Sequence, residues 1–101
     1  IPTYNTKTIV LVTQFSEELM NKSLEIASKL RQNGINTEVY PIADKMSKQL
    51  KYADRKNIPF ALIIGPEEDK VEKINIKNLK SGEQKTVTLT DAIKLIQEIK
   101  I

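Results

Sequence analysis

Short apolar runs alternate along the chain with longer amphipathic stretches. Residues 8–12 and 60–64 are apolar and rich in β-branched side chains, which predicts two strands buried on both faces of a parallel sheet. Residues 60–64 form the most hydrophobic run and are expected to be the central strand, ending at Gly65-Pro66. Residues 35–40 alternate apolar and polar side chains, which predicts a strand with one wetter face at or near a sheet edge.

Apolar residues at helical spacing predict three helices. The first follows Ser16, a candidate N-cap, and ends at Asn33-Gly34, because glycine and asparagine favour helix termination. The second spans about residues 45–56, and the third begins near Thr90-Asp91. The side chains expected to face the core are Leu19, Met20, Leu24, Ala27 and Leu30 in the first helix, Met46, Leu50 and Ala53 in the second, and Ala92, Leu95, Ile96 and Ile99 in the third.

The remaining segments predict a strand pair and complete the fold. Residues 71–77 alternate, and after Ser81-Gly82 a last strand is expected over residues 86–89. Strands separated by helices imply right-handed parallel crossovers, whereas the closely connected last pair implies an antiparallel strand. We therefore predict an α/β protein with three layers, in the order βαβαβ-β-α, containing a mixed five-stranded sheet and three helices.

Length and composition indicate one domain without catalytic apparatus. The chain has 101 residues, 40% of them hydrophobic, which suits a single core. We expect residues 1–6 to be a trimmed linker, residues 7–101 to be the domain, and the chain, which begins with Ile1, to be a piece of a longer one. No apolar run approaches a membrane span and no signal peptide is evident, so a cytosolic location without membrane contact is expected.

The residue types that support common catalytic and metal sites are missing. The chain contains no cysteine and no histidine, so its serines lack the usual activating base and zinc lacks its preferred ligands. Its three glycines form no phosphate-binding loop. The acidic residues 67–69 are interpreted as a solvated loop, because adjacent carboxylates rarely converge on one ion. We expect no catalytic residue, no metal site and no cofactor in this chain.

The charge distribution raises the possibility of a polyanionic partner. The formal net charge is +3, and the segment 44–57 alone carries as much, with five cations and two anions. One broad side of the second helix combines cations, an amide and an aromatic ring, a set that suits single-stranded RNA. The alternative is an ordinary exposed helix in a lysine-rich protein. The residues on that side are Lys45, Lys48, Gln49, Tyr52, Arg55 and Lys56.

A series of motifs then resembles a known family. The series is Lys-Gln-Leu-Lys-Tyr-Ala-Asp at 48–54, Ile-Pro-Phe-Ala-Leu-Ile-Ile-Gly at 58–65, Glu68, Ile-Asn-Ile-Lys-Asn-Leu at 74–79 and Ser-Gly-Glu-Gln at 81–84. It resembles the C-terminal anticodon-binding domain of class II aminoacyl-tRNA synthetases. The Gly-Glu-Gln ending points to the histidyl member, because threonyl and prolyl relatives usually differ there. The family's α/β fold agrees with the fold predicted above.

The resemblance implies a function and a division of labour. Such a domain grips the anticodon stem-loop of a histidine tRNA, while a separate domain activates the amino acid with ATP and transfers it to the tRNA. The parent is then expected to be a cytoplasmic histidine-tRNA ligase, homodimeric, with ATP and Mg²⁺ in its catalytic domain. The alternative is a synthetase-like regulatory or dimerisation module without aminoacylation activity. A small-ligand-binding or enzymatic α/β protein has no supporting motif.

Carried over by position, the resemblance also implies the RNA-binding residues. Glu68 and Lys77 match positions that contact anticodon bases in related domains, since a carboxylate accepts from base amino groups and an ammonium donates to carbonyls or phosphate. One departure is Glu72, which stands where the family commonly has a glycine before the fourth strand. The full set of expected RNA contacts is Glu68, Lys77, Gln84, Gln49, Lys45, Tyr52 and Lys48.

Overall fold

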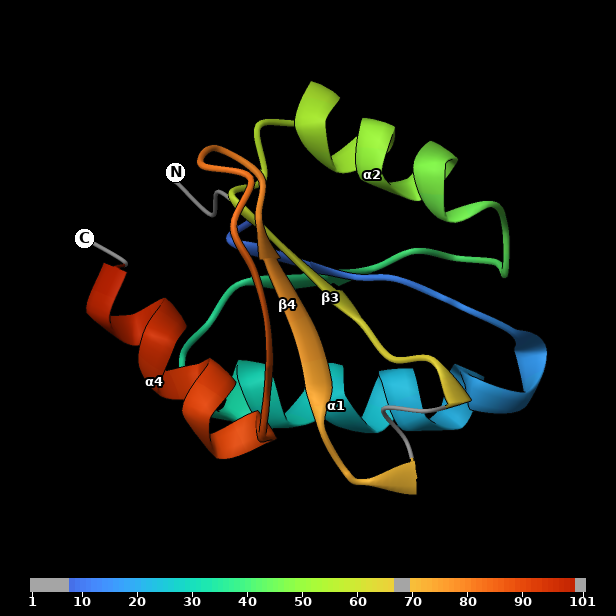
Figure 1. Ribbon diagram of the computed structural model, residues 1–101, viewed down its shortest axis with the longest axis horizontal. Coiled ribbons are helices and arrows are strands. Elements are labelled where there is room, and N and C mark those ends of the chain that lie inside the picture. The colour runs from blue at the N-terminus through green and yellow to red at the C-terminus, as the bar shows by residue number, and fades with distance from the viewer. Residues whose placement is uncertain (1–7, 67–69, 100–101) are drawn as a thin grey trace, which may run out of the picture.

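The computed structural model describes residues 8–66 and 70–99, and Figure 1 shows their arrangement. Each buried strand coincides with an apolar run, and each helix with an amphipathic stretch. Along the chain the elements are β1 (Val10–Val12), η1 (Glu17–Leu19), α1 (Met20–Gln32), β2 (Thr37–Val39), α2 (Met46–Arg55), β3 (Phe60–Ile63), β4 (Ile74–Asn78), β5 (Gln84–Val87) and α4 (Leu89–Ile99).

The sheet has five strands in the order β2-β1-β3-β4-β5. β1 pairs in parallel with both β2 and β3, while β4 pairs antiparallel with β3 and β5. In Figure 1, α2 lies on one side of the sheet, and α1 and α4 lie on the other. The predicted three-layer α/β fold with a mixed sheet, a central third strand and a second strand at the edge is confirmed.

Two apolar clusters hold the layers together. The larger lies between the sheet and the pair α1 and α4, and includes Val10, Val12 and Leu62 from the strands with Leu30 and Ile96 from the helices. The smaller lies under α2. β1 is buried on both faces, because successive side chains point alternately to the two clusters. The members of the smaller cluster are Leu11, Ala53 and Ile58, with Tyr40, Tyr52 and Leu79 packed against them.

The predicted inward face of α1 is wrong at Leu24. This side chain is 47% exposed, whereas the residues of α1 that are buried are Ser23, Ile26, Ala27 and Leu30. Ser23 occupies an inward position because its hydroxyl donates a 3.2 Å hydrogen bond to the carbonyl of Thr13. The helix is therefore rotated so that a serine faces the sheet and the neighbouring leucine faces outwards.

Three predicted boundaries also differ. Ser16 precedes η1 rather than α1, and its side chain makes no capping hydrogen bond. Leu89 was expected in the last strand but is the first residue of α4. β4 begins at Ile74, because Glu72 adopts a φ of 54°, which is incompatible with extended backbone.

The backbone at Glu72 predicts a stabilising substitution. A side chain in the left-handed region costs about 1 kcal/mol relative to glycine, so Glu72→Gly should raise the melting temperature by about 4–8 °C. Thermal unfolding followed by circular dichroism measures the change. Glu25→Gly in α1 is the matched control and should lower the melting temperature, since glycine weakens a helix interior. A Glu72→Gly variant with a lower melting temperature would show that the backbone at Glu72 is not strained.

The free edge of β2 is occupied by a side chain from the neighbouring helix. β2 pairs with β1 alone in the described sheet. The Arg31 guanidinium donates to the carbonyl of Thr37 through Nε at 3.3 Å and Nη2 at 3.0 Å.

Within the described ranges, no helix is both long and apolar enough to cross a membrane.

Candidate nucleic-acid interface

A row of polar side chains follows β4 and β5 on the α2 side of the sheet. Because Ile76 points into the cluster beneath α1 and α4, strand alternation directs Asn75 and Lys77 to the opposite face. The register places Lys77 opposite Gln84 and Asn75 opposite Thr86. Lys77 and Asn75 are half-buried, and the two β5 residues are exposed. We call Asn75, Lys77, Gln84 and Thr86 the polar sheet face.

The β4–β5 turn holds Gln84 in its position opposite Lys77. The side-chain Oδ1 of Asn78 accepts hydrogen bonds from the backbone N–H groups two and three residues later, at 3.0 and 3.2 Å. Gly82 adopts a φ of 82°, and its N–H donates to the carbonyl of Asn78 at 2.8 Å. This turn is closed by its own hydrogen bonds, which fix Gln84 opposite Lys77.

Two buried side-chain acceptors have no hydrogen-bond partner in the part of the chain that the structure describes. They are Oδ1 of Asn75 and Oε1 of Gln14. An unpaired buried polar atom costs about 1–3 kcal/mol. Asn75 stands beside Lys77 on the polar sheet face, so this acceptor and an ammonium donor lie within one surface.

The cations Lys45 and Lys48 stand exposed at the start of α2. Asp44 arranges this end of the helix: its Oδ1 accepts the backbone N–H of Lys45 at 2.8 Å, and its Oδ2 lies 3.5 Å from Nζ of Lys48. The hydrogen bond from the Lys45 backbone, followed by the nearby lysine charge, lowers the pKa of Asp44 despite some desolvation. Both lysine side chains are exposed, although the Lys48 ammonium is paired with Asp44.

Gln49 was expected on the exposed side of α2 as a base contact, and this expectation is wrong. Its side chain is fully buried. Oε1 accepts the N–H of Gln14 at 2.7 Å, while Nε2 donates to the carbonyls of Gln14 and Asp44 at 2.9 and 2.8 Å. We call these three hydrogen bonds the Gln49 clamp, which ties the segment after β1 to the start of α2.

Tyr52 faces an internal cluster near the β2 edge. Its hydroxyl donates to Oε1 of Glu38, its ring meets Tyr40 edge-on at 5.6 Å, and Nζ of Lys56 lies 5.5 Å from the ring centre. The hydrogen bond from Tyr52 lowers the pKa of Glu38, and desolvation opposes this shift. The other carboxylate oxygen of Glu38, Oε2, accepts a hydrogen bond from the Thr8 hydroxyl. The hydrogen bond between Tyr52 and Glu38 raises the pKa of Tyr52. One ring face is thus already used by a lysine, which leaves less of it for an RNA base.

The predicted RNA contacts therefore fall into separate groups. The structure brings Lys77 and Gln84 together and leaves Lys45 and Lys48 exposed at the start of α2. Glu68 lies outside the described residues. Thr86 was not singled out from the sequence, although placing it opposite Asn75 requires only the register of the last two strands.

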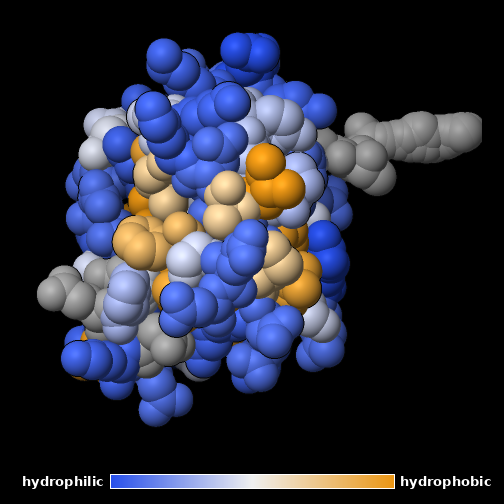
Figure 2. Space-filling view, turned by 90° about the vertical axis from the view of Figure 1, so that its right-hand side faces the viewer, coloured by the Kyte–Doolittle hydropathy of each residue, from blue (hydrophilic) through white to orange (hydrophobic). Residues whose placement is uncertain are grey.

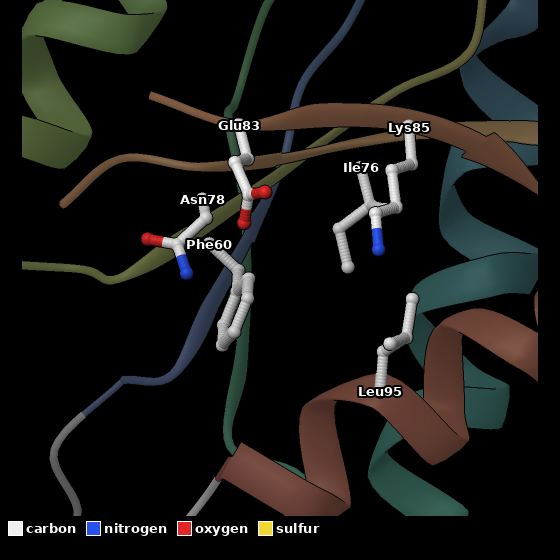
Figure 3. A pocket seen from close by; sticks show the side chains of 6 residues that line it. All are labelled: Phe60, Ile76, Asn78, Glu83, Lys85 and Leu95. Atoms are coloured by element: carbon white, nitrogen blue, oxygen red, sulfur yellow. The ribbon is translucent and has the colours of Figure 1, made fainter. Parts of the chain in front are cut away.

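A small pocket opens on the other side of the sheet, next to α4. Figure 3 shows an apolar floor with polar side chains from the β4–β5 hairpin around it. The lining residues are Phe60, Ile76, Asn78, Glu83, Lys85 and Leu95. This pocket shares no residue with the polar sheet face.

Within the ranges 8–66 and 70–99, no group of three or more acidic, histidine or cysteine side chains could hold a metal ion.

Solved structures share this architecture. Histidyl-tRNA synthetase from Nostoc sp. PCC 7120 aligns with a TM-score of 0.88 and 35% identity, over 91% of this chain and 22% of that one. The RNA binding domain of threonyl-tRNA synthetase from Cryptosporidium parvum Iowa II aligns with a TM-score of 0.86 at 17% identity, over 92% of this chain and 24% of that one. The second likeness shows the fold alone. The class of protein is thus an α/β domain with the fold of these synthetase domains.

Sequence comparison narrows the class. The anticodon binding domain family matches residues 7–99, and the chain belongs to this family. Histidine-tRNA ligase from Cytophaga hutchinsonii is 48% identical over 90 residues, which is 88% of this chain and 20% of that protein. The Clostridium tetani enzyme is 40% identical over 80 residues, 79% of this chain and 18% of that protein. The chain spans about a fifth of these relatives, and the resemblance to the histidyl domain is confirmed.

Proposed function

We propose that the chain is the tRNA-binding domain of a histidine-tRNA ligase and that it binds the anticodon stem-loop of a histidine tRNA. The observation that carries this proposal is the polar sheet face, where Lys77 and Gln84 stand side by side on a domain of the anticodon-binding family. Because the relatives described above are histidine-tRNA ligases, we infer that the parent protein attaches histidine to its tRNA.

The chemistry of this surface suits unpaired bases. The Lys77 ammonium can donate to a base carbonyl or a phosphate, and the Gln84 amide can both donate and accept. Lys45 and Lys48 would supply phosphate contacts from the start of α2. Glu68, assigned by the resemblance, would accept from base amino groups; it lies outside the described residues.

The remainder of the parent protein would perform the chemistry. In this proposal a separate catalytic domain binds ATP and Mg²⁺, the parent is a cytoplasmic homodimer, and the present domain positions the tRNA. The chain's coverage of about a fifth of its relatives leaves room for such a domain. Nothing in the described residues favours the alternative of a regulatory or dimerisation module without tRNA binding.

A hairpin-binding experiment tests the proposal. The 101-residue chain should bind an RNA hairpin carrying the histidine anticodon, with an affinity that falls as salt rises. Lys77→Ala should weaken binding by roughly tenfold, because one base or phosphate contact is lost. Lys29→Ala, which removes the same charge from an exposed position on α1, is the matched control and should change little.

Two results would count against the proposal. One is an absence of binding at low salt while circular dichroism shows an intact fold. The other is an equal loss in Lys77→Ala and Lys29→Ala, which would indicate attraction by net charge alone. A tight dimer that is indifferent to the hairpin would instead support the regulatory alternative.

A further inference from the structure

Exposed apolar side chains gather where the parallel strands end. Four large hydrophobic residues are markedly exposed in the described ranges, and three of them lie at this edge. Phe15 and Ile42 follow the carboxyl ends of β1 and β2, and Val71 precedes β4, which starts beside the end of β3. Figure 2 shows apolar side chains in the middle of this face, surrounded by hydrophilic ones. The fourth, Leu24, lies on α1.

Hydrogen bonds tie the chain next to Phe15 to the start of α2. It follows Gln14, whose backbone N–H and carbonyl are both bonded by the Gln49 clamp. Gln49 belongs to the first turn of α2, directly after Lys48, so the clamp fixes the Phe15 segment against the end of the helix that carries Lys45 and Lys48. The Phe15 side chain is 48% exposed even though its neighbour Gln14 is buried. The chain at Phe15 is therefore tied to the first turn of α2, which carries Lys48 and directly follows Lys45.

The same edge continues into the polar sheet face. Thr13 donates to the carbonyl of Leu62 through its N–H at 3.0 Å and its hydroxyl at 2.8 Å. This extends the pairing of β1 with β3, so Thr13 stands next to Ile63, which in turn pairs with Asn75. Phe15 comes two residues after this row. The register thus places the segment that carries Phe15 at the edge of the sheet where β4 begins with the polar sheet face.

We propose that Phe15 is a stacking platform for an unpaired base of the RNA that the domain binds. The inference rests on the proposed function and adds a base-binding position to it. An aromatic ring flanked by cations is the combination that binds single-stranded nucleic acid without reading base edges. A protein partner would be favoured by the apolar groups alone, whereas the exposed lysines at the start of α2, the helix end to which this segment is tied, favour RNA.

The test uses the 101-residue chain and the histidine-anticodon hairpin. Phe15→Leu keeps an apolar side chain but removes the aromatic face, and should weaken binding by roughly tenfold or more. Phe15→Tyr should bind like the original chain. Because no charge is lost, the salt dependence of binding should stay the same in both variants, unlike that of Lys48→Ala. Leu24→Ala, a change at an equally exposed hydrophobic residue, should leave the affinity unaltered.

A spectroscopic signal separates stacking from an indirect effect. With 2-aminopurine in place of an unpaired loop base, fluorescence should be quenched on binding at one loop position, and the quenching should be lost in Phe15→Leu. If Phe15→Leu binds the hairpin as tightly as the original chain does, the stacking proposal is wrong while the proposed function stands. If the original chain does not bind the hairpin at all, both are wrong. A Phe15→Leu variant that loses affinity for a protein partner but not for RNA would also overturn it.

Discussion

Replacing Gln49 with alanine is expected to lower the free energy of unfolding by about 3 kcal/mol or more. The change removes all three bonds of the Gln49 clamp and leaves the buried N–H and carbonyl of Gln14 and the partly buried carbonyl of Asp44 without those partners. Domains of this size are stable by only about 5–15 kcal/mol, so the loss should be obvious in urea unfolding. Gln49→Glu should be at least as destabilising at neutral pH, because a buried carboxylate would face the two carbonyl oxygens to which the amide donates.

The control is Lys51→Ala, an exposed position on the same helix, which should change stability by less than about 0.5 kcal/mol. The experiment also separates two roles for Gln49. If it contacted RNA from the helix surface, Gln49→Ala would retain its stability and lose only affinity. That result would contradict the buried clamp.

The second large effect is expected from a pair of leucines on α1. Leu30 is fully buried between the helix and the sheet, so Leu30→Ala should cost about 2–5 kcal/mol through lost burial and the cavity left behind. Leu24 is 47% exposed, and Leu24→Ala should cost below about 1 kcal/mol. Both substitutions remove the same atoms from one helix, so chemical denaturation compares burial directly.

If Leu30→Ala and Leu24→Ala lowered the free energy of unfolding equally, the orientation of α1 described above, with Leu30 inward and Leu24 outward, would be wrong. Ser23→Ala refines the comparison, because it removes the hydroxyl that donates to the carbonyl of Thr13. We expect a loss of about 1 kcal/mol from that hydrogen bond. A neutral result would show that the serine does not determine which side of the helix faces the sheet.

The topology could be predicted because its strands are apolar runs of different kinds. β1 and β3 need burial on both faces and are continuously hydrophobic, whereas β2 alternates and lies at the edge. The short connection through Gly82 could only join neighbouring antiparallel strands. Element ends were less predictable, since Leu89 suits a strand and a helix equally well and its place depends on packing in the larger cluster.

The placement of the expected RNA contacts could be predicted only in part, and Gln49 shows why. Lys77 and Gln84 follow from strand alternation and register, but assigning the faces of α2 required knowing which polar residue is buried. The spacing 46, 49, 50 and 53 describes one helical face, with Gln49 at one border of it. That spacing was a usable signal. Its hydrogen-bond partners, the backbone of Gln14 and Asp44, could not be found from sequence because they belong to a different loop and to the helix start.

Both borders of the sheet bear on how the domain behaves at high concentration. An unpaired strand edge is a template on which a second chain can add and start an aggregate. At β2 the Arg31 side chain occupies the Thr37 carbonyl, and at β5 the solvent-exposed Lys85 places a charge on the opposite border. We therefore expect Arg31, which joins α1 to β2, also to hinder self-association through the β2 edge. Replacing Arg31 should raise the turbidity of a concentrated solution before it changes thermal unfolding.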